Sequence, residues 1–244
     1  MDALYAYFRL TDDLADGPQA SRQALADWRA RTRAALDGKF THPIHPALHR
    51  TATTFAIPGE ELEAVIDGAE ADLDPVRIAT FSPDLETYCY RVAGVVGRAC
   101  VRVWGFRGNA LELAVDSGLA FQLTNVLRDL GEDLARGRVY LPADELARFG
   151  TPPETWRDRS PAFRDLMAFQ VGRARDYYRR AEPLADLLAP DGRAVFGVMT
   201  GVYRRLLDEI ERREFDVFTE RIRLGRVTKA RVFLGGWPVK WGWV

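Results

Sequence analysis

Residues 121–142, FQLTNVLRDLGEDLARGRVYLP, carry the pattern that decides the fold. Apolar residues recur here at helical spacing, in which each residue advances about 100° around the axis. On that helix Gln122, Asn125, Asp129 and Asp133 fall within roughly 80° of one another. The stretch therefore predicts a largely apolar helix that presents one polar, acidic stripe.

A second acidic stretch, TDDLADG, occupies residues 11–17. Its Asp12 and Asp16 continue a stripe that begins with Tyr5 and Arg9, all within roughly 40° on a helical wheel. Acidic pairs four residues apart also occur on solvated helix faces. Two such pairs, each continued by side chains suited to binding, instead favour cation sites, because like charges held on one face repel each other.

Diphosphate chemistry assisted by Mg²⁺ fits two acidic helices. Mg²⁺ prefers a few carboxylates together with water and phosphate oxygens. Two such helices facing each other across a cavity would hold several Mg²⁺ ions, and these would clamp a diphosphate and assist its departure. The sequence contains no Glu-x-x-His pair, which disfavours a di-iron bundle.

Composition narrows the function further. The chain has 244 residues, of which 47% are hydrophobic, so it is long enough for a sizeable core. Charged residues nearly cancel and leave a formal net charge of -1, which disfavours nucleic acid as a partner. We see no signal peptide and no apolar run near the ~20 residues that span a bilayer. We therefore expect a cytoplasmic protein, soluble or in peripheral contact with the membrane.

Strand signals are weak, and helical periodicity dominates the whole chain. We expect one all-α domain over residues 1–244, without linkers or repeats. The predicted helices cover residues 2–16, 19–37, 58–73, 82–105, 108–135, 142–148, 160–188, 190–215 and 226–236.

Two clusters of potential metal ligands have simpler interpretations. His42, His45 and His49 lie in THPIHPALH, which reads as a loop leading into a short helix. A metal site is one interpretation of this cluster, and we favour a structural one. Cys89 and Cys100 match no metal or disulfide spacing and read as buried thiols in a reducing compartment.

Four stretches together resemble the squalene/phytoene synthases, in that family's order and spacing. They are YAYFRLTDDLAD, YCYRVAGVVG, FQLTNVLRDLGEDLARGRVYLP and VYRRLLDEIERREFDVFTERIRLGRVTKA. The resemblance implies an isoprenoid synthase-type helical bundle with a central active-site cavity. It also implies a prenyltransferase that condenses two prenyl diphosphates head to head through a cyclopropylcarbinyl diphosphate.

The same resemblance implies a set of site residues. The metal ligands would be Asp12, Asp16, Asn125, Asp129 and Asp133, and the catalytic residues would be Tyr88 with the four aspartates. Diphosphate oxygens would be bound by Arg9, Tyr5, Gln122, Asn125, Arg128, Tyr203 and Arg221, with Arg223 and Lys229 as weaker candidates. From the residues alone, Tyr88 and Tyr203 also read as core aromatics and Arg221 as a surface arginine.

An apolar wall is expected beside the acidic stripes. Val92, Val96, Leu119 and Ala120 would suit a prenyl tail, although any core helix would look similar. In VAGVVG the two glycines, Gly94 and Gly97, read as positions of close helix packing or of a kink.

Both ends of the chain depart from the family pattern. Members of the family usually have 20 to 40 further residues before the first acidic motif, and these form a front helix over the active site. The chain is expected to lack that helix. At the other end, VFLGGWPVKWGWV is too short to span a membrane, and its three tryptophans suit either an interface or packing against the domain.

The sequence favours a bacterial-type enzyme that joins two farnesyl diphosphates to presqualene diphosphate, squalene or hydroxysqualene. The alternative within the family is phytoene synthase, which joins two geranylgeranyl diphosphates. NADPH would be needed only for a reductive last step, and no GxGxxG motif on a βαβ unit supports it. Two other classes are a non-catalytic scaffold, which the four aspartates disfavour, and a terpene cyclase, which YCYRVAG and RGRVYLP disfavour.

Overall fold

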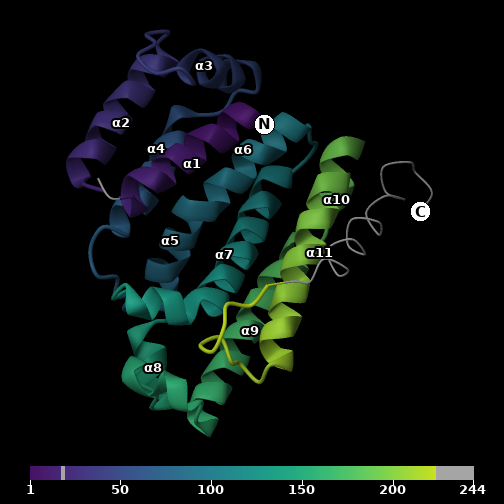
Figure 1. The fold of residues 1–244 in the computed structure, drawn as a ribbon. Helices are drawn as coiled ribbons and strands as arrows, with labels where there is room; N and C mark the ends of the chain where they lie inside the picture. The colour runs from purple at the N-terminus through teal and green to yellow at the C-terminus, as the bar shows by residue number, and fades with distance from the viewer. Residues whose placement is uncertain (18–19, 224–244) are drawn as a thin grey trace.

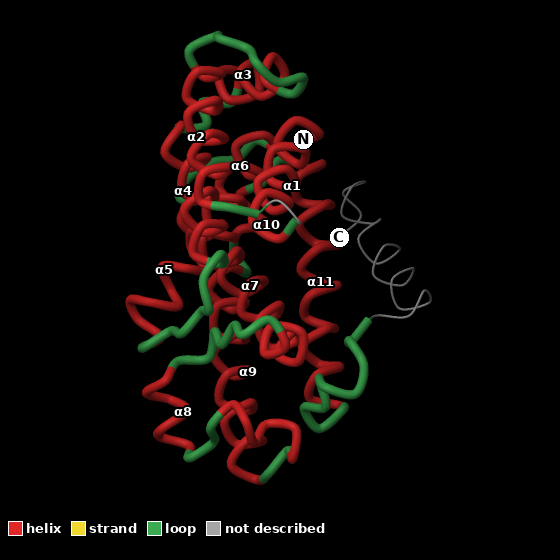
Figure 2. Tube along the Cα trace, turned by 60° about the vertical axis from the view of Figure 1, so that its left-hand side comes forward, coloured by secondary structure: helices red, strands yellow, loops and turns green. Residues whose placement is uncertain are grey.

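The protein folds as a bundle of helices, seen from two sides in a computed structural model (Figures 1 and 2). The structure describes residues 1–17 and 20–223. Every regular element within these ranges is helical. The α-helices are α1 (Asp2–Asp16), α2 (Arg22–Leu36), α3 (His45–Thr54), α4 (Gly59–Ala71), α5 (Glu86–Cys89), α6 (Val95–Trp104), α7 (Ala110–Ala135), α8 (Ala143–Phe149), α9 (Pro161–Ala181), α10 (Leu184–Leu187) and α11 (Pro190–Arg212).

Helix α7 runs through the middle of the bundle (Figure 1) and packs along α9, α6 and α11. Leu119, Leu123, Leu127 and Leu130 are buried on it and join the largest hydrophobic cluster. Because α7 is apolar on more than one side, it is covered by neighbours over most of its length. The polar stripe predicted from Gln122 to Asp133 is the part left facing the interior cavity.

Helix α1 is anchored to the rest of the N-terminal half by the face opposite its acidic stripe. Its Leu4, Tyr7, Thr11 and Ala15 are buried against α2, α3 and α4. The Tyr7 hydroxyl donates to the backbone carbonyl of α4 residue Leu62 (3.0 Å). Since residues one turn apart share a helix face, burial of this set leaves Asp12 and Asp16 pointing away from it. These contacts fix the rotation of α1.

The segment predicted as one helix over 82–105 is helical up to Trp104, with a non-helical backbone only at Ser82 (φ -112°, ψ 124°), but its hydrogen bonding changes between α and π turns along the way. Two π-helical stretches, η1 (Phe81–Leu85) and η2 (Tyr90–Gly94), flank α5, and α6 follows directly. Beside η2, the α7 residue Gly118 lies so close that an added Cβ would come within 2.5 Å of the Ala93 carbonyl oxygen. Single π turns inside helices are common next to functional sites. The stretch η2 begins two residues after Tyr88.

Other predicted boundaries differ in smaller ways. The helix expected over 160–188 ends at Ala181, and Pro183 precedes the separate short helix α10, because proline cannot continue a helix. A 3₁₀ helix, η3 (Pro153–Asp158), was not predicted. The predicted helix over 226–236 and the tryptophan-rich segment over 232–244 lie outside the described residues.

The histidine cluster makes packing contacts at the start of α3. The rings of His42 and His45 both lie against Trp28, with centroids 5.5 and 5.7 Å from its ring. The His49 ring nitrogen Nδ1 lies 3.1 Å from the Leu36 carbonyl oxygen. The helix begins at His45, so the prediction of a loop leading into a short helix is confirmed.

Cys89 is fully buried, whereas Cys100 is only half-buried, and both thiols are free. The prediction of a buried thiol is therefore right for the first and only partly right for the second. No helix within the described ranges is long and apolar enough to cross a membrane.

Candidate active site

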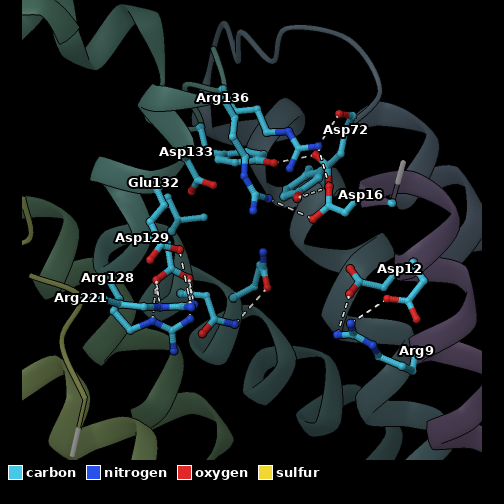
Figure 3. A pocket seen from close by; sticks show the side chains of 18 of the residues that line it. Arg9, Asp12, Asp16, Asp72, Arg128, Asp129, Glu132, Asp133, Arg136 and Arg221 are labelled. Carbon is cyan, nitrogen blue, oxygen red and sulfur yellow. Dashed lines mark hydrogen bonds and ion pairs between the residues drawn. The ribbon is translucent and has the colours of Figure 1, made fainter. Parts of the chain in front are cut away.

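A cavity of about 820 Å³ opens between the C-terminal halves of α1 and α7 (Figure 3). It is also lined by the residue after α4, by the segment following α7 and by Arg221. Among residues 1–17 and 20–223, seven carboxylates and five arginines line it. The excess of carboxylates means that a polyanion would enter only together with cations.

The α1 wall carries Arg9, Asp12, Asp13 and Asp16. The Arg9 guanidinium bridges its own helix, with Nη2 at 2.7 Å from Asp13 Oδ1 and Nη1 at 3.4 Å from Asp12 Oδ2. Burial and then the charge of Asp16 raise the pKa of Asp12 above its ordinary value. Asp12 and Asp16 of the predicted stripe therefore lie together, and this wall is electrostatically unfavourable for a further negative group.

Asp16 reaches across to the segment that follows α7. Its two carboxylate oxygens accept hydrogen bonds from Arg138 Nη2 (2.8 Å) and Arg136 Nη1 (3.1 Å). Neither arginine was singled out by the sequence analysis. They join the two acidic walls at one edge of the cavity, where Figure 3 labels Arg136 and Asp16.

The α7 wall carries Gln122, Asn125, Asp129 and Asp133, as the sequence predicted. Asn125 donates weakly to Gln122 (Nδ2 to Oε1, 3.4 Å), while its own Oδ1 is buried and has no hydrogen-bond partner in the described chain. Burial, followed by the charge of Asp129, raises the pKa of Asp133 to about 7. Asn125 and Asp133 both line the cavity, and the Asn125 Oδ1 is left without a partner in the described chain.

Asp129 is held between two arginines. Arg128 Nε lies 2.7 Å from Oδ1, and Arg221 donates from Nε and Nη2 at 3.1 Å each. Arg221 Nη1 also lies 3.5 Å from Glu132 Oε2. The structure thus brings the predicted residues Arg128 and Arg221 to the cavity, although Arg221 lies far from α7 in the sequence.

Tyr88 belongs to a buried cluster that the sequence analysis missed. Its hydroxyl donates to Asp72 Oδ2 (3.0 Å), and the Tyr140 hydroxyl donates to Asp72 Oδ1 (2.6 Å). The two rings stack with centroids 4.9 Å apart. Arg138 Nη2 donates to the Asp72 carbonyl oxygen (2.8 Å), which joins this cluster to Asp16.

Burial is the largest cause of the pKa shifts of Asp72 and Tyr88. It raises the pKa of Asp72, and together with the charge of Asp72 it raises the pKa of Tyr88 well above its ordinary value. Tyr88 is therefore a neutral phenol near neutral pH. Its ring and its hydroxyl are held in one orientation by Asp72 and by the stacked Tyr140 ring.

Of the remaining predicted site residues, one lines the cavity and the others do not or lie outside the described residues. Tyr203 lines the cavity and its ring lies 4.6 Å from that of Phe121, centroid to centroid. Tyr5 is not brought to the cavity: it is 70% exposed, one turn of α1 before Arg9, where the lining begins. Arg223 is exposed and does not line the cavity, and Lys229 lies outside the described residues.

An apolar groove of about 220 Å³ continues from the acidic cavity between α6, α7 and α11. Gln122, Asn125 and Tyr203 line both spaces, so the two adjoin. Of the predicted apolar lining, Val92 and Val96 are present. Leu119 and Ala120 are instead buried in the core, because the face of α7 that meets the groove carries Ser117, Gly118 and Phe121.

The residues present fit Mg²⁺ ions that are completed by a substrate. Among the described residues, no group of three or more His, Cys, Asp or Glu side chains could hold a metal ion alone. The buried, unpartnered Oδ1 of Asn125 nonetheless lies one helical turn from Asp129 and two from Asp133. Mg²⁺ is usually bound through one or two carboxylates plus phosphate oxygens, which is the donor set offered here.

Comparisons with known proteins fit this geometry. A family model described as "Squalene/phytoene synthase" matches residues 1–228. The chain belongs to the squalene/phytoene synthase family. Membership makes it a prenyltransferase, of the family that condenses two prenyl diphosphates head to head.

Individual relatives show how similar the chain is to particular members of the family. The chain is 38% identical to a phytoene synthase of Arthrospira platensis over 245 residues, covering 90% of this chain and 77% of the relative. A chloroplastic phytoene synthase of Arabidopsis thaliana is 37% identical, and the alignment covers 93% of this chain but 56% of that protein. The structure superimposes on a crystal structure of a dehydrosqualene synthase with a TM-score of 0.89 at 26% identity, covering 96% of this chain and 83% of the other.

The names of the sequence relatives bear on the length of the prenyl chain in the substrate. The sequence analysis favoured farnesyl diphosphate and kept phytoene synthase as its alternative. Relatives at 36–38% identity are phytoene synthases, so the comparisons favour the alternative.

Proposed function

We propose that the protein is a phytoene synthase, which condenses two geranylgeranyl diphosphates head to head with Mg²⁺ bound. The observation that carries the proposal is the cavity in which Asp12 and Asp16 of α1 face Asp129 and Asp133 of α7, with an apolar groove adjoining it. The sequence relatives support the C20 substrate over the C15 one.

In this proposal the two acidic walls hold the metal ions. The residues with free or exchangeable oxygens are Asp12, Asp16, Asn125, Asp129 and Asp133. Mg²⁺ bound there would neutralise the leaving diphosphate and assist its ionisation. Since the carboxylates outnumber the arginines, substrate binding would depend on the divalent ion.

The arginines would orient the diphosphates. A guanidinium fork matches phosphate oxygens, so Arg9, Arg128 and Arg221 suit this task. Each is now paired with an aspartate of the cavity, and these pairs would be exchanged for phosphate contacts when substrate and metal enter. Gln122 would add a neutral hydrogen bond at the junction with the apolar groove.

Tyr88 would act next to the reacting carbons. Because its pKa is raised, it stays protonated, which favours a role for its electron-rich ring and its hydroxyl over that of a phenolate base. The ring would stabilise a nearby carbocation through its π face. Asp72 and Tyr140 would keep that face in position. Tyr203, at the junction of the cavity and the groove, would cover the neighbouring carbons.

The experiment measures Mg²⁺-dependent turnover in aspartate variants. Asp12→Asn and Asp129→Asn each remove a carboxylate from one wall, and we expect each to lower turnover at least ~100-fold while the helical circular dichroism spectrum is unchanged. Asp27→Asn is the matched control, because Asp27 is exposed on α2 and outside the cavity. Unchanged turnover in both cavity variants would overturn the proposal.

A further inference from the structure

The apolar groove has a direction along the bundle. It begins where Gln122, Asn125 and Tyr203 also line the acidic cavity. From there α7 runs back through Gly118 to Ala114, and antiparallel to it α6 runs forward through Gly97 to Trp104. The pairing is close, since a Cβ added at Gly97 would lie 2.7 Å from the Ala114 carbonyl oxygen.

The span between the lining residues Val92 and Trp104 corresponds to the length of three to four isoprene units. Val92 and Trp104 are twelve residues apart, which is about 18 Å at the helical rise. An isoprene unit adds four main-chain carbon–carbon bonds of about 1.5 Å each, so it extends a chain by roughly 5 Å. A prenyl tail of three to four isoprene units, with its diphosphate in the acidic cavity, would therefore reach Trp104 with the unit farthest from the diphosphate.

Trp104 stands at the far end and is held in place. It is the last residue of α6 and lines the groove together with Leu184 of α10 and Phe196 of α11, both of which are buried. Behind it, the first turn of α11 approaches so closely that a Cβ added at Gly192 would lie 2.5 Å from the Trp104 Cβ. The base of the indole therefore has no room to retreat from a longer chain.

We propose that Trp104 closes the apolar groove and sets the longest prenyl chain that this protein accepts. The inference rests on the proposed function for the identity of the ligand, but it concerns the binding of the tail and not the chemistry. A large aromatic residue at a closed end excludes chains that are one unit too long, because well-packed interiors do not absorb extra carbon atoms.

Binding of unreactive ligands tests the proposal apart from turnover. The probes are prenyl thiodiphosphates of 10, 15, 20 and 25 carbons with Mg²⁺, titrated against the full chain by calorimetry. For the wild type we expect affinity to rise with length until the tail reaches Trp104 and to fall for the next unit. In Trp104→Ala, the ratio of affinities for the first excluded length and the longest accepted one should rise at least about tenfold.

Two further variants keep the test decisive if Trp104→Ala folds poorly. Trp104→Leu should move the limit in the same direction. Cys100→Phe, one turn nearer the acidic cavity on the same wall, should shorten the longest accepted chain. Phe106→Ala is the control, because Phe106 is 39% exposed and does not line the groove.

The outcomes separate the two proposals. Identical chain-length profiles in the wild type and both Trp104 variants would overturn the inference, even if the enzyme makes phytoene. A shifted profile would support it, even if the wild type turns over neither prenyl diphosphate. In that case the proposed function would fail and the assignment of Trp104 would stand.

Discussion

Gly118 offers a test of how closely the site depends on the packing of α7 against η2. A Cβ at this position would lie 2.5 Å from the Ala93 carbonyl oxygen, 2.7 Å from its carbon and 2.8 Å from the Gly94 Cα. All three are backbone atoms, so no side chain can turn aside to make room. The Gly118→Ala variant therefore forces two helical segments apart.

The expected cost follows from two opposing effects. Alanine favours the helix over glycine by about 1 kcal/mol. Overpacking a dense core costs about 1–3 kcal/mol, and rigid backbone puts this case at the upper end. We expect a net destabilisation of roughly 1–2 kcal/mol, or about 2–8 °C in Tm for a chain of this size. Turnover should fall as well, because α7 carries Asp129 while η2 follows Tyr88.

Urea unfolding monitored by circular dichroism measures this effect, with Gly172→Ala as the matched control. Gly172 lies within α9 and is exposed, and a Cβ added there would meet no neighbouring segment of the described chain within 4 Å. Only the helix preference acts at this position, so alanine should stabilise the protein by roughly 0.5–1 kcal/mol. If Gly118→Ala is stabilised as much as Gly172→Ala, the close contact between α7 and η2 does not exist as described.

Two other predictions concern charged groups. Asp72→Asn replaces the carboxylate that accepts hydrogen bonds from the Tyr88 and Tyr140 hydroxyls with a weaker acceptor. Hydrogen bonds to a charged group contribute about 1.5–3 kcal/mol each. Because the weaker bonds would hold Tyr88 less firmly in position, we expect kcat to fall roughly 10- to 100-fold while the fold is unchanged. Wild-type kcat in this variant would show that the cluster does not orient Tyr88. Hydrogen bonds from Arg212 and then Arg213 lower the pKa of Glu209 to about 2, below an unfolded value of about 4.3. The stability it contributes is therefore complete above about pH 5 and is lost as the pH falls toward 2. Glu209→Gln should be less stable than the wild type by no more than about 1 kcal/mol at pH 7 and equal to it near pH 2, and a difference independent of pH would contradict this assignment.

The acidic walls could be predicted because each is local to one helix. Four-residue spacing alone places Asp12 beside Asp16 and Asp129 beside Asp133, and both pairs line the cavity. The same periodicity placed Tyr5 on the α1 stripe, although its side chain is exposed. A helical wheel gives direction around the axis but does not show where along the axis a cavity ends.

The missed residues lie outside helical stripes and meet only through tertiary contacts. Asp72 follows the end of α4, and Arg138 and Tyr140 lie in the segment after α7. They converge because the Val139 amide donates to the Val76 carbonyl oxygen (3.0 Å), a pairing between distant segments that no local pattern encodes. The stretch RGRVYLP was a signal that could have drawn attention to the last two.

The π turn within the helix over 82–105 has the same origin. The apolar periodicity is continuous there, so one helix was the natural prediction. The π turn of η2 faces the close approach of Gly118, a feature of two segments packed together. Sequence reading did identify Gly97 as a position of close helix packing, and its contact with Ala114 confirms that interpretation.

Product analysis tests the central claim most directly. The purified protein would be incubated with Mg²⁺ and either geranylgeranyl or farnesyl diphosphate, with and without NADPH, and the products identified by mass spectrometry. We predict a C40 hydrocarbon, phytoene, from geranylgeranyl diphosphate, formed without NADPH and absent when EDTA removes the metal. A C30 product from farnesyl diphosphate with no C40 product, or no product from either substrate, would contradict the account.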